Sequence, residues 1–269
     1  MDCSDAVLVS AESSPGAWGL YRFSHHGTVF YAKADSKAPL KFMEWGWELA
    51  VLRLLTPRPS DCNWADISDV VVWSYKPLKE ARYAWHPKRI DIRDLNPIRH
   101  LNHKVVLCRY ESELVCSKIA RFEHELPEIE SEAQAYRIID GHNIGPRFLG
   151  HLTENGRVMG ILMEYVADTR HATGADLGVC APILHRLHEF KILLGDTNRN
   201  NFLVSVDGGR AMICDFASSE LDADDVALKE EEDGLLTSLE SDEFDEEDSM
   251  WDIYGQHRFT EVPPFEYRI

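Results

Sequence analysis

The stretch Gly195-Asp196-Thr197-Asn198-Arg199-Asn200-Asn201-Phe202-Leu203-Val204 decides how the rest of this sequence is interpreted. After a short gap it is followed by Met212-Ile213-Cys214-Asp215-Phe216-Ala217. Asn201 stands five residues after Asp196, and Asp215 ends the next apolar run. Carboxylate and amide oxygens are ligands that magnesium accepts beside phosphates, and a carboxylate can take the proton of an attacking hydroxyl. The pattern therefore predicts a phosphate and metal site, with Asp196 as the base and Asn201 and Asp215 as metal ligands.

The composition excludes some classes of partner. The chain has 269 residues, of which 44% are apolar, and its net charge of -18 comes from 28 basic and 46 acidic residues. A general binder of nucleic acid or of anionic membranes needs a basic face, so neither partner is expected. The acidity is concentrated, because residues 220–248 hold 15 acidic residues and a single lysine, Lys229. The rest of the chain is only mildly acidic.

The cysteines and the apolar runs indicate the compartment. None of the six cysteines forms a CxxC pair or stands near a histidine at a zinc-like spacing. The sequence shows no signal peptide and no apolar run of the ~18–20 residues that a membrane span needs. We therefore expect reduced thiols, no membrane partner, and a cytoplasmic or nuclear location.

The chain divides into three parts by composition. Residues 1–97 form an aromatic-rich N-terminal extension with six of the seven tryptophans, residues 98–240 form the central domain, and residues 241–269 form an acidic tail. In the extension, alternation and turn residues predict a hairpin and a strand, an apolar stripe predicts a helix, and a connecting region follows. The hairpin is expected at 17–34 and the strand at 70–75. The helix is expected at 42–55 and the connecting region at 77–97.

The central domain has a specific order of elements. Periodicity predicts strand, strand, helix, strand, strand, helix, loop and strand. The corresponding ranges are 104–109, 114–120, 128–140, 147–152, 160–166, 181–190, the quoted loop, and 211–214. A further helix is predicted over 224–239, before the most acidic run.

Several motifs in this order resemble the protein-kinase-like superfamily. Lys118, in Val115-Cys116-Ser117-Lys118-Ile119-Ala120, is similar to the strand lysine that contacts the α- and β-phosphates. Glu132, fourteen residues later, resembles the helix glutamate that positions that lysine, with Glu128 and Glu130 as rivals. The segment Leu162-Met163-Glu164-Tyr165-Val166 is similar to the hinge strand, where the backbone of Glu164 and Val166 would bind an adenine edge.

The resemblance implies a fold, cofactors and residue roles. The expected fold is α+β and two-lobed, with a small lobe at 98–166, a reduced large lobe at 167–240, and an α/β N-terminal extension. The implied cofactors are ATP and Mg²⁺. Lys118, Glu132 and Asp196 would be the catalytic residues, Asn201 and Asp215 would bind the metal, and Lys118, Glu164 and Val166 would bind the nucleotide.

Two details narrow the resemblance. Gly195 before Asp196, and the nearby Leu184-His185, are similar to small-molecule kinases of the aminoglycoside- and choline-kinase kind. We expect His185 and His188 to pack in a helix rather than to act in catalysis.

The chain also resembles short fungal kinase-like proteins, some of which are labelled α-galactosidase, through Arg121-Phe122-Glu123 and the segment from Gly145 to Glu154. Nothing in the motifs resembles a glycosidase barrel, so glycosidase activity is not expected.

Three departures from the family pattern leave two functions open. Leu194 stands where histidine is usual, Ala217 replaces the glycine after Asp-Phe and is expected to make the metal loop stiffer or differently posed, and residues 107–114 contain no glycine. The first hypothesis is a phosphotransferase that moves the γ-phosphoryl group of ATP to a hydroxyl acceptor, either a small molecule or a protein Ser/Thr. The alternative is a pseudokinase, a non-catalytic module that binds a nucleotide or a protein partner.

Overall fold

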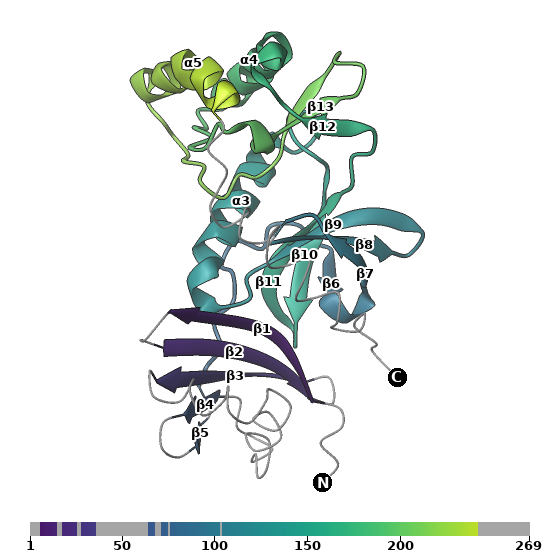
Figure 1. Ribbon diagram of the computed structural model, residues 1–269, viewed down its shortest axis with the longest axis vertical. Helices are drawn as coiled ribbons and strands as arrows, with labels where there is room; N and C mark the ends of the chain where they lie inside the picture. The colour runs from purple at the N-terminus through teal and green to yellow at the C-terminus, as the bar shows by residue number, and fades with distance from the viewer. Residues whose placement is uncertain are drawn as a thin grey trace. The chain divides into compact units, whose positions relative to one another are not determined.

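The computed structural model describes residues 6–14, 18–25, 28–35, 64–67, 71–74, 76–102 and 104–241. Over these residues the protein is α+β, with three β-sheets and three α-helices (Figure 1). The chain divides into two compact units, Met1–Lys79 with Arg121–Glu123, and Glu80–Ala120 with His124–Ile269. The sequence analysis set the boundary of the extension near residue 97, whereas the compact units divide after Lys79.

The first unit contains a five-stranded sheet in the order β1-β2-β3-β4-β5. The predicted hairpin is present, with its strands paired antiparallel from His25 opposite Thr28. Phe23 and Phe30 face each other across it, with ring centroids 5.2 Å apart and both side chains buried. The predicted helix at 42–55 lies outside the described residues. The strands are β1 (Ala6–Ser14), β2 (Trp18–His25), β3 (Thr28–Asp35), β4 (Trp64–Ile67) and β5 (Val71–Ser74).

The second unit is built on a six-stranded sheet in the order β6-β10-β11-β9-β8-β7. All neighbours are antiparallel except β6 and β10, which are parallel. The region 77–97 was expected only to connect the two parts, but it supplies β6 and the start of β7. The strands are β6 (Arg89–Asp91), β7 (Asn96–His100), β8 (Val105–Tyr110), β9 (Glu113–Ile119), β10 (Phe148–Glu154) and β11 (Arg157–Glu164).

The central strand β11 is apolar on both faces because both faces are covered. Ile161 and Met163 belong to the large core that includes helix α3 (Leu126–Ile139), while Leu162 between them belongs to a second core with Leu152 and Val115. Successive side chains of a strand point to opposite faces, so the two cores lie on opposite sides of this sheet. Figure 1 shows α3 running across one of these faces.

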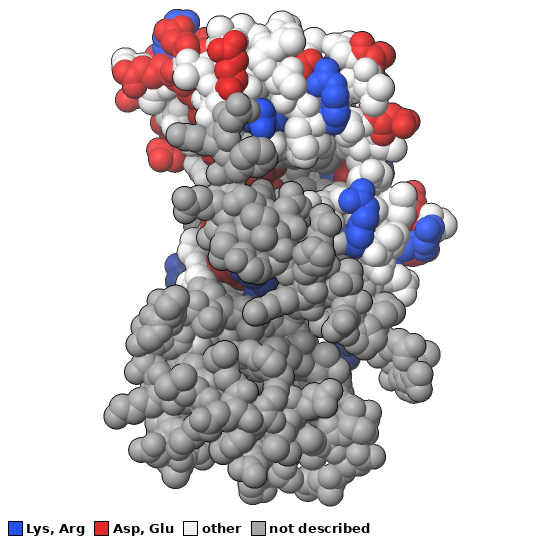
Figure 2. All heavy atoms as spheres, viewed as in Figure 1, with Lys and Arg blue, Asp and Glu red and all other residues white. Residues whose placement is uncertain are grey.

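The rest of the second unit combines a small sheet with two helices. The sheet has the order β12-β13-β14, from Thr169–His171, Phe202–Ser205 and Ala211–Ile213. Helices α4 (Leu177–His188) and α5 (Asp225–Glu240) match the helices predicted at 181–190 and 224–239, and they pack against each other. Figure 2 shows acidic side chains gathered over α5. No helix in the described ranges is long and apolar enough to cross a membrane.

The two-sided burial of β11 predicts the cost of a cavity. Ile161 is fully buried, so Ile161→Ala is expected to lower the free energy of unfolding by about 2–5 kcal/mol. The matched control is Ile98→Ala on β7, where the side chain is 49% exposed and the change is expected to stay within about 0.5 kcal/mol. Urea denaturation of both variants measures the difference, and equal losses would contradict the assigned burial.

A buried histidine on β10 predicts a pH dependence of stability. Burial, with the charges of Arg89 and His86, lowers the pKa of His151 from 6.5 to about 4. In the unfolded chain His151 therefore binds a proton below about pH 6.5, whereas in the folded chain it binds one only below about pH 4. The free energy of unfolding should fall across this window by up to about 3 kcal/mol through this residue. His151→Gln should reduce the pH slope by one proton, whereas identical slopes would show that His151 does not titrate in this way.

Candidate functional site

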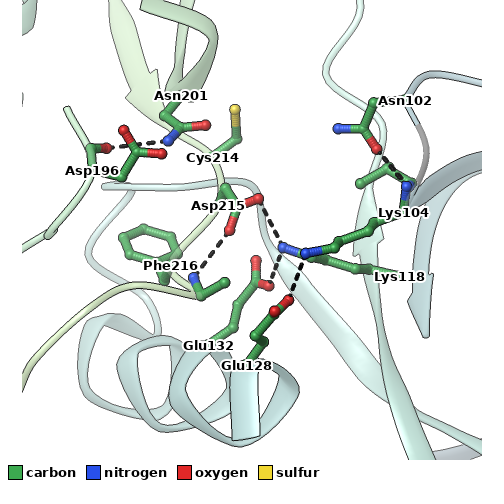
Figure 3. A network of polar contacts seen from close by, with 12 residues as sticks. Asn102, Lys104, Lys118, Glu128, Glu132, Asp196, Asn201, Cys214, Asp215 and Phe216 are labelled. Atoms are coloured by element: carbon green, nitrogen blue, oxygen red, sulfur yellow. Dashed lines mark hydrogen bonds and ion pairs between the residues drawn. The ribbon is translucent and has the colours of Figure 1, made fainter. Parts of the chain in front are cut away.

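Lys118 lies at the centre of a buried ion-pair cluster (Figure 3). Its Nζ is 2.8 Å from Oε2 of Glu132 and 2.8 Å from Oδ2 of Asp215. The side chains of Lys118 and Glu132 are 2% and 1% exposed, and that of Asp215 is 33% exposed. The expected pairing of Lys118 with Glu132 is thus present, and Asp215 joins it from a third segment of the chain.

Two local periodicities bring Lys118 and Glu132 together. On β9, Lys118 stands two residues after Cys116, which packs against the large core, so both side chains point to the face that α3 covers. On α3, Glu132 lies on the same stripe as Ile129 and Tyr136, which are buried in that core. Lys118 and Glu132 therefore meet between the strand and the helix.

The charges of the cluster stabilise one another against burial. Burial opposes the charged form of Lys118, but Glu132 and Asp215 outweigh it and raise the pKa of the lysine. Burial raises the pKa of Glu132 above its usual range even though Lys118 acts in the other direction. Burial also acts against the charge of Asp215, but Lys118 lowers the pKa of that carboxyl. Removal of the lysine would leave the buried carboxylate of Glu132 without its counter-charge.

The cluster brings together ionisable groups from three separate segments of the chain. Besides Lys118, the backbone of Phe216 stabilises the charged form of Glu132, and burial acts against it. Ionisable groups that are buried and strongly coupled in this way concentrate at functional sites. The cluster is therefore the candidate binding site.

The structure distinguishes Glu132 from its two rivals. Glu128 pairs with Lys104, whose Nζ is 2.8 Å from Oε2 of the glutamate. Glu130 accepts a hydrogen bond of 2.8 Å from the backbone N–H of Arg82. Lys104 was not among the residues predicted from the sequence. The signal was weak, because the lysine stands just before a strand and gains its position from the pairing of that strand with β9.

The Asp196 loop is held by short polar contacts. Nδ2 of Asn198 donates to both carboxylate oxygens of Asp196, at 3.0 and 2.9 Å. Nδ2 of Asn201 donates to the main-chain carbonyl of Asp196 at 3.1 Å, which leaves Oδ1 of Asn201 free of donors among the described residues. Asn201 is half-buried rather than part of the core, and Figure 3 shows its Oδ1 on the side of Cys214 and Asp215.

Gly195 is required by the turn that precedes Asp196. Its φ is +79°, and a Cβ atom there would lie 2.2 Å from the carbonyl oxygen of Ser218. Only glycine tolerates both the left-handed backbone and this close approach. Leu194 before it is 1% exposed and fills the large core, as expected for an apolar residue at that position.

The loop after β14 accommodates Ala217 without strain at that residue. The left-handed residue is Asp215, with φ of 73°, and Ala217 is not among the described residues with positive φ. The backbone N–H of Ala217 donates to Oδ1 of Asp215 at 3.0 Å. The restraint expected from the missing glycine is therefore not seen at position 217, because the unusual backbone angle falls two residues earlier.

Helix α5 holds the start of the Asp196 loop through Glu231. The carboxylate of Glu231 accepts the N–H groups of Leu194 at 3.0 Å and Gly195 at 2.7 Å, and lies 2.7 Å from Nε2 of His188. His188 is buried between α4 and α5, and His185 pairs with Glu232 at 2.8 Å. His188 packs between the helices, as expected, whereas His185 is exposed and forms its ion pair at the surface. The role of Glu231 was missed, because a strongly acidic segment such as 220–248 predicts solvated carboxylates.

The two predicted hinge residues differ in what they offer a ligand. The backbone N–H of Glu164 donates to the carbonyl of Arg147 at 3.0 Å, and its Oε1 accepts the N–H of Arg147 at 3.0 Å. The N–H of Val166 has no hydrogen-bond partner among the described residues, while its carbonyl accepts from Oγ1 of Thr169 at 3.0 Å. Val166, and not Glu164, offers an open backbone donor.

The predicted metal ligands form a minimal set. No cluster of three or more His, Cys, Asp or Glu side chains suited to a metal ion occurs in the described ranges. Asn201 and Asp215 supply one amide and one carboxylate, joined through the N–H of Cys214, which donates to the carbonyl of Asn201 at 2.9 Å. Magnesium needs few protein ligands when phosphates and water complete its octahedron. The pair suits a metal that arrives with a phosphate ligand, and not a permanent protein-bound metal.

No protein-family model and no curated protein matches the chain. The interpretation of the site therefore rests on its geometry.

The contacts of Glu231 predict that it supports the loop. In Glu231→Gln only one side-chain oxygen remains to accept the N–H groups of Leu194 and Gly195, and the amide brings a competing donor. Unfolding free energy should fall by about 1–3 kcal/mol. Amide hydrogen exchange at Leu194 and Gly195 should accelerate.

Glu230→Gln is the matched control, because Glu230 is exposed on the same helix. It should change stability by less than about 0.5 kcal/mol and leave exchange at both amides unchanged. If both variants behave alike, Glu231 does not hold the loop.

Proposed function

We propose that the chain is an ATP- and Mg²⁺-dependent phosphotransferase with a kinase-like arrangement, acting on a hydroxyl acceptor. The observation that carries the proposal is the convergence of Lys118, Glu132 and Asp215 from a strand, a helix and a loop onto one buried ion-pair cluster. Strongly coupled charges of this kind concentrate at functional sites. The position of Asn201 against the carbonyl of Asp196 supports the same interpretation.

The residues present fit a magnesium nucleotide. Lys118 carries the compact point charge that suits nucleotide phosphates, and Glu132 fixes the direction of its amine. Oδ1 of Asn201 and the carboxylate of Asp215 would hold Mg²⁺, which supplies charge neutralisation for the phosphates. The N–H of Val166 would donate a hydrogen bond to an adenine edge. Asp196, oriented by Asn198, would receive the proton of the acceptor hydroxyl.

The contact between Lys118 and Asp215 defines the state described here. Oδ2 of Asp215 lies 2.8 Å from Nζ of Lys118, so the carboxylate and the amine form an ion pair with each other in this state. A phosphate and a metal ion would take their places, the phosphate on the lysine and the metal on the aspartate. Nucleotide binding in this proposal therefore exchanges one internal ion pair for two ligand contacts.

A pseudokinase is the second candidate, and one observation favours it. The connection between β7 and β8, Leu101-Asn102-His103-Lys104, contains no glycine and leads into Val105, which pairs with Lys118. The glycine-free stretch 107–114 lies farther from Lys118, because Tyr110 pairs with Glu113 at the other end of the hairpin. Neither segment offers phosphates a glycine-rich run of backbone N–H groups. In that case the protein would be a non-catalytic module that binds a nucleotide weakly or binds a protein partner.

Nucleotide binding is tested by thermal unfolding with MgATP. At about ten times the dissociation constant, a ligand stabilises the folded state by about 1.4 kcal/mol, which raises Tm by roughly 3–6 °C. The gain should be reduced by EDTA and lost in Asp215→Asn, because the carboxylate ligand is removed. Asp222→Asn is the control, since Asp222 is exposed in the loop that follows.

The two candidate functions are separated by turnover. A protein that gains stability with MgATP and hydrolyses or transfers phosphate, with loss of turnover in Asp196→Asn, is a phosphotransferase. Stabilisation without turnover in a panel of hydroxyl acceptors would favour the pseudokinase. The absence of any Tm gain at millimolar MgATP would overturn the phosphotransferase and would favour a pseudokinase that binds a protein partner.

A further inference from the structure

A second lysine stands at the mouth of the Lys118 cluster. Lys104 directly precedes β8, and its neighbour Val105 is paired with Lys118 across the two strands. Oδ1 of Asn102 accepts the N–H groups of both Lys104 and Val105, at 2.9 and 2.7 Å. The backbone that carries Lys104 is therefore fixed relative to the strand that carries Lys118.

The amine of Lys104 reaches the same site. Its Nζ pairs with Glu128, one helical turn before Glu132 on α3, and Figure 3 shows both amines directed to the space between α3 and Asp215. Burial opposes the charge of Asp215 and Lys118 is its main counter-charge, but Lys104 also lowers the pKa of Asp215. The second lysine thus lies close enough to act on the predicted metal ligand.

The two lysines differ in how accessible they are. Lys104 is 25% exposed and has one carboxylate partner that is itself 40% exposed, whereas Lys118 is 2% exposed and has two carboxylate partners. An exposed ion pair is weak and easily exchanged for another anion. An incoming phosphate would therefore meet an available cation at Lys104 before it meets one at Lys118.

The segment that joins β7 to β8 explains why such a cation would be useful. Its residues Leu101-Asn102-His103-Lys104 contain no glycine and lead into Val105, the strand partner of Lys118, so this segment lacks a glycine-rich run of backbone donors that could close over phosphates. A flexible lysine is a point charge with three donors and can follow a phosphate without backbone closure.

We propose that Lys104 is a second phosphate-binding residue for a magnesium nucleoside triphosphate, held ready by Glu128 in the absence of ligand. The inference rests on the proposed function and adds to it a residue outside the motif set. Binding would transfer the amine from the glutamate to a phosphate oxygen. Glu128 then competes with the nucleotide for Lys104, so its removal should not weaken binding.

The test compares the loss of the cation with the loss of its partner. Calorimetric titration with MgATP should give a dissociation constant roughly tenfold higher for Lys104→Met than for the wild type. Glu128→Gln should bind as tightly as the wild type or more tightly. Adenosine, which has no phosphates, should bind all three proteins equally if it binds at all.

Each of the other outcomes contradicts either the role of Lys104 or the proposed function. If the wild type binds MgATP and Lys104→Met binds it within about twofold, the role of Lys104 is wrong and the proposed function stands. If both variants weaken binding equally, the ion pair is structural and the inference fails. If the wild type binds no MgATP, the proposed function fails and the inference with it.

A measurement on the wild type avoids any question of variant folding. An amine-reactive label should modify Lys104, which is partly exposed, more readily than Lys118. MgATP should protect Lys104 from the label, and so should magnesium triphosphate if the phosphates alone are the determinant. Unchanged labelling of Lys104 under saturating MgATP would contradict the inference.

Discussion

The burial of Lys118 between two carboxylates is the constraint on which the rest of the second unit depends. Taking an ammonium group out of water costs several kcal/mol, and only well-placed counter-charges offset that cost. Glu132 and Asp215 supply them at 2.8 Å each. A shift of α3 along the sheet by one turn would separate Glu132 from the lysine. The apolar packing of Ile129 and Tyr136 therefore has a second effect besides excluding water. It fixes the position of α3 along the sheet, and in this position Glu132 stabilises the buried charge of Lys118.

The order of elements between residues 104 and 240 was predictable because each long element carries its own periodicity. The strands that include Lys118 and Leu162 alternate or are wholly apolar, and the stripe of α3 identifies the face that carries Glu132. The short strands β6, β12 and β13 were not predicted as strands, since three or four residues become a strand only through a partner that the sequence does not reveal. Lys104 was missed for the same reason, and Glu231 was missed because its hydrogen bond to Gly195 spans 36 residues.

The departures from the kinase-like pattern differ in their effect on the proposed site. Leu194 fills the core, and Ala217 avoids strain because Asp215 adopts the left-handed backbone. The glycine-free connection between β7 and β8 is different, since side chains cannot restore the backbone donors that it lacks. If phosphates bind there, they do so through lysine amines, whose attraction is more sensitive to salt than that of a closed nest of backbone N–H groups.

The hold of α5 on the Asp196 loop has a consequence for biosynthesis. The loop is translated first, and Glu231 leaves the ribosome only after a further stretch of chain has been made. Until then the N–H groups of Leu194 and Gly195 lack their carboxylate acceptor, and His188 lacks its partner on α5. The segment that carries Asp196 is therefore assembled late, whatever the state of the sheet that precedes it. The acidic part of the chain acts in this way as the last structural component of the site.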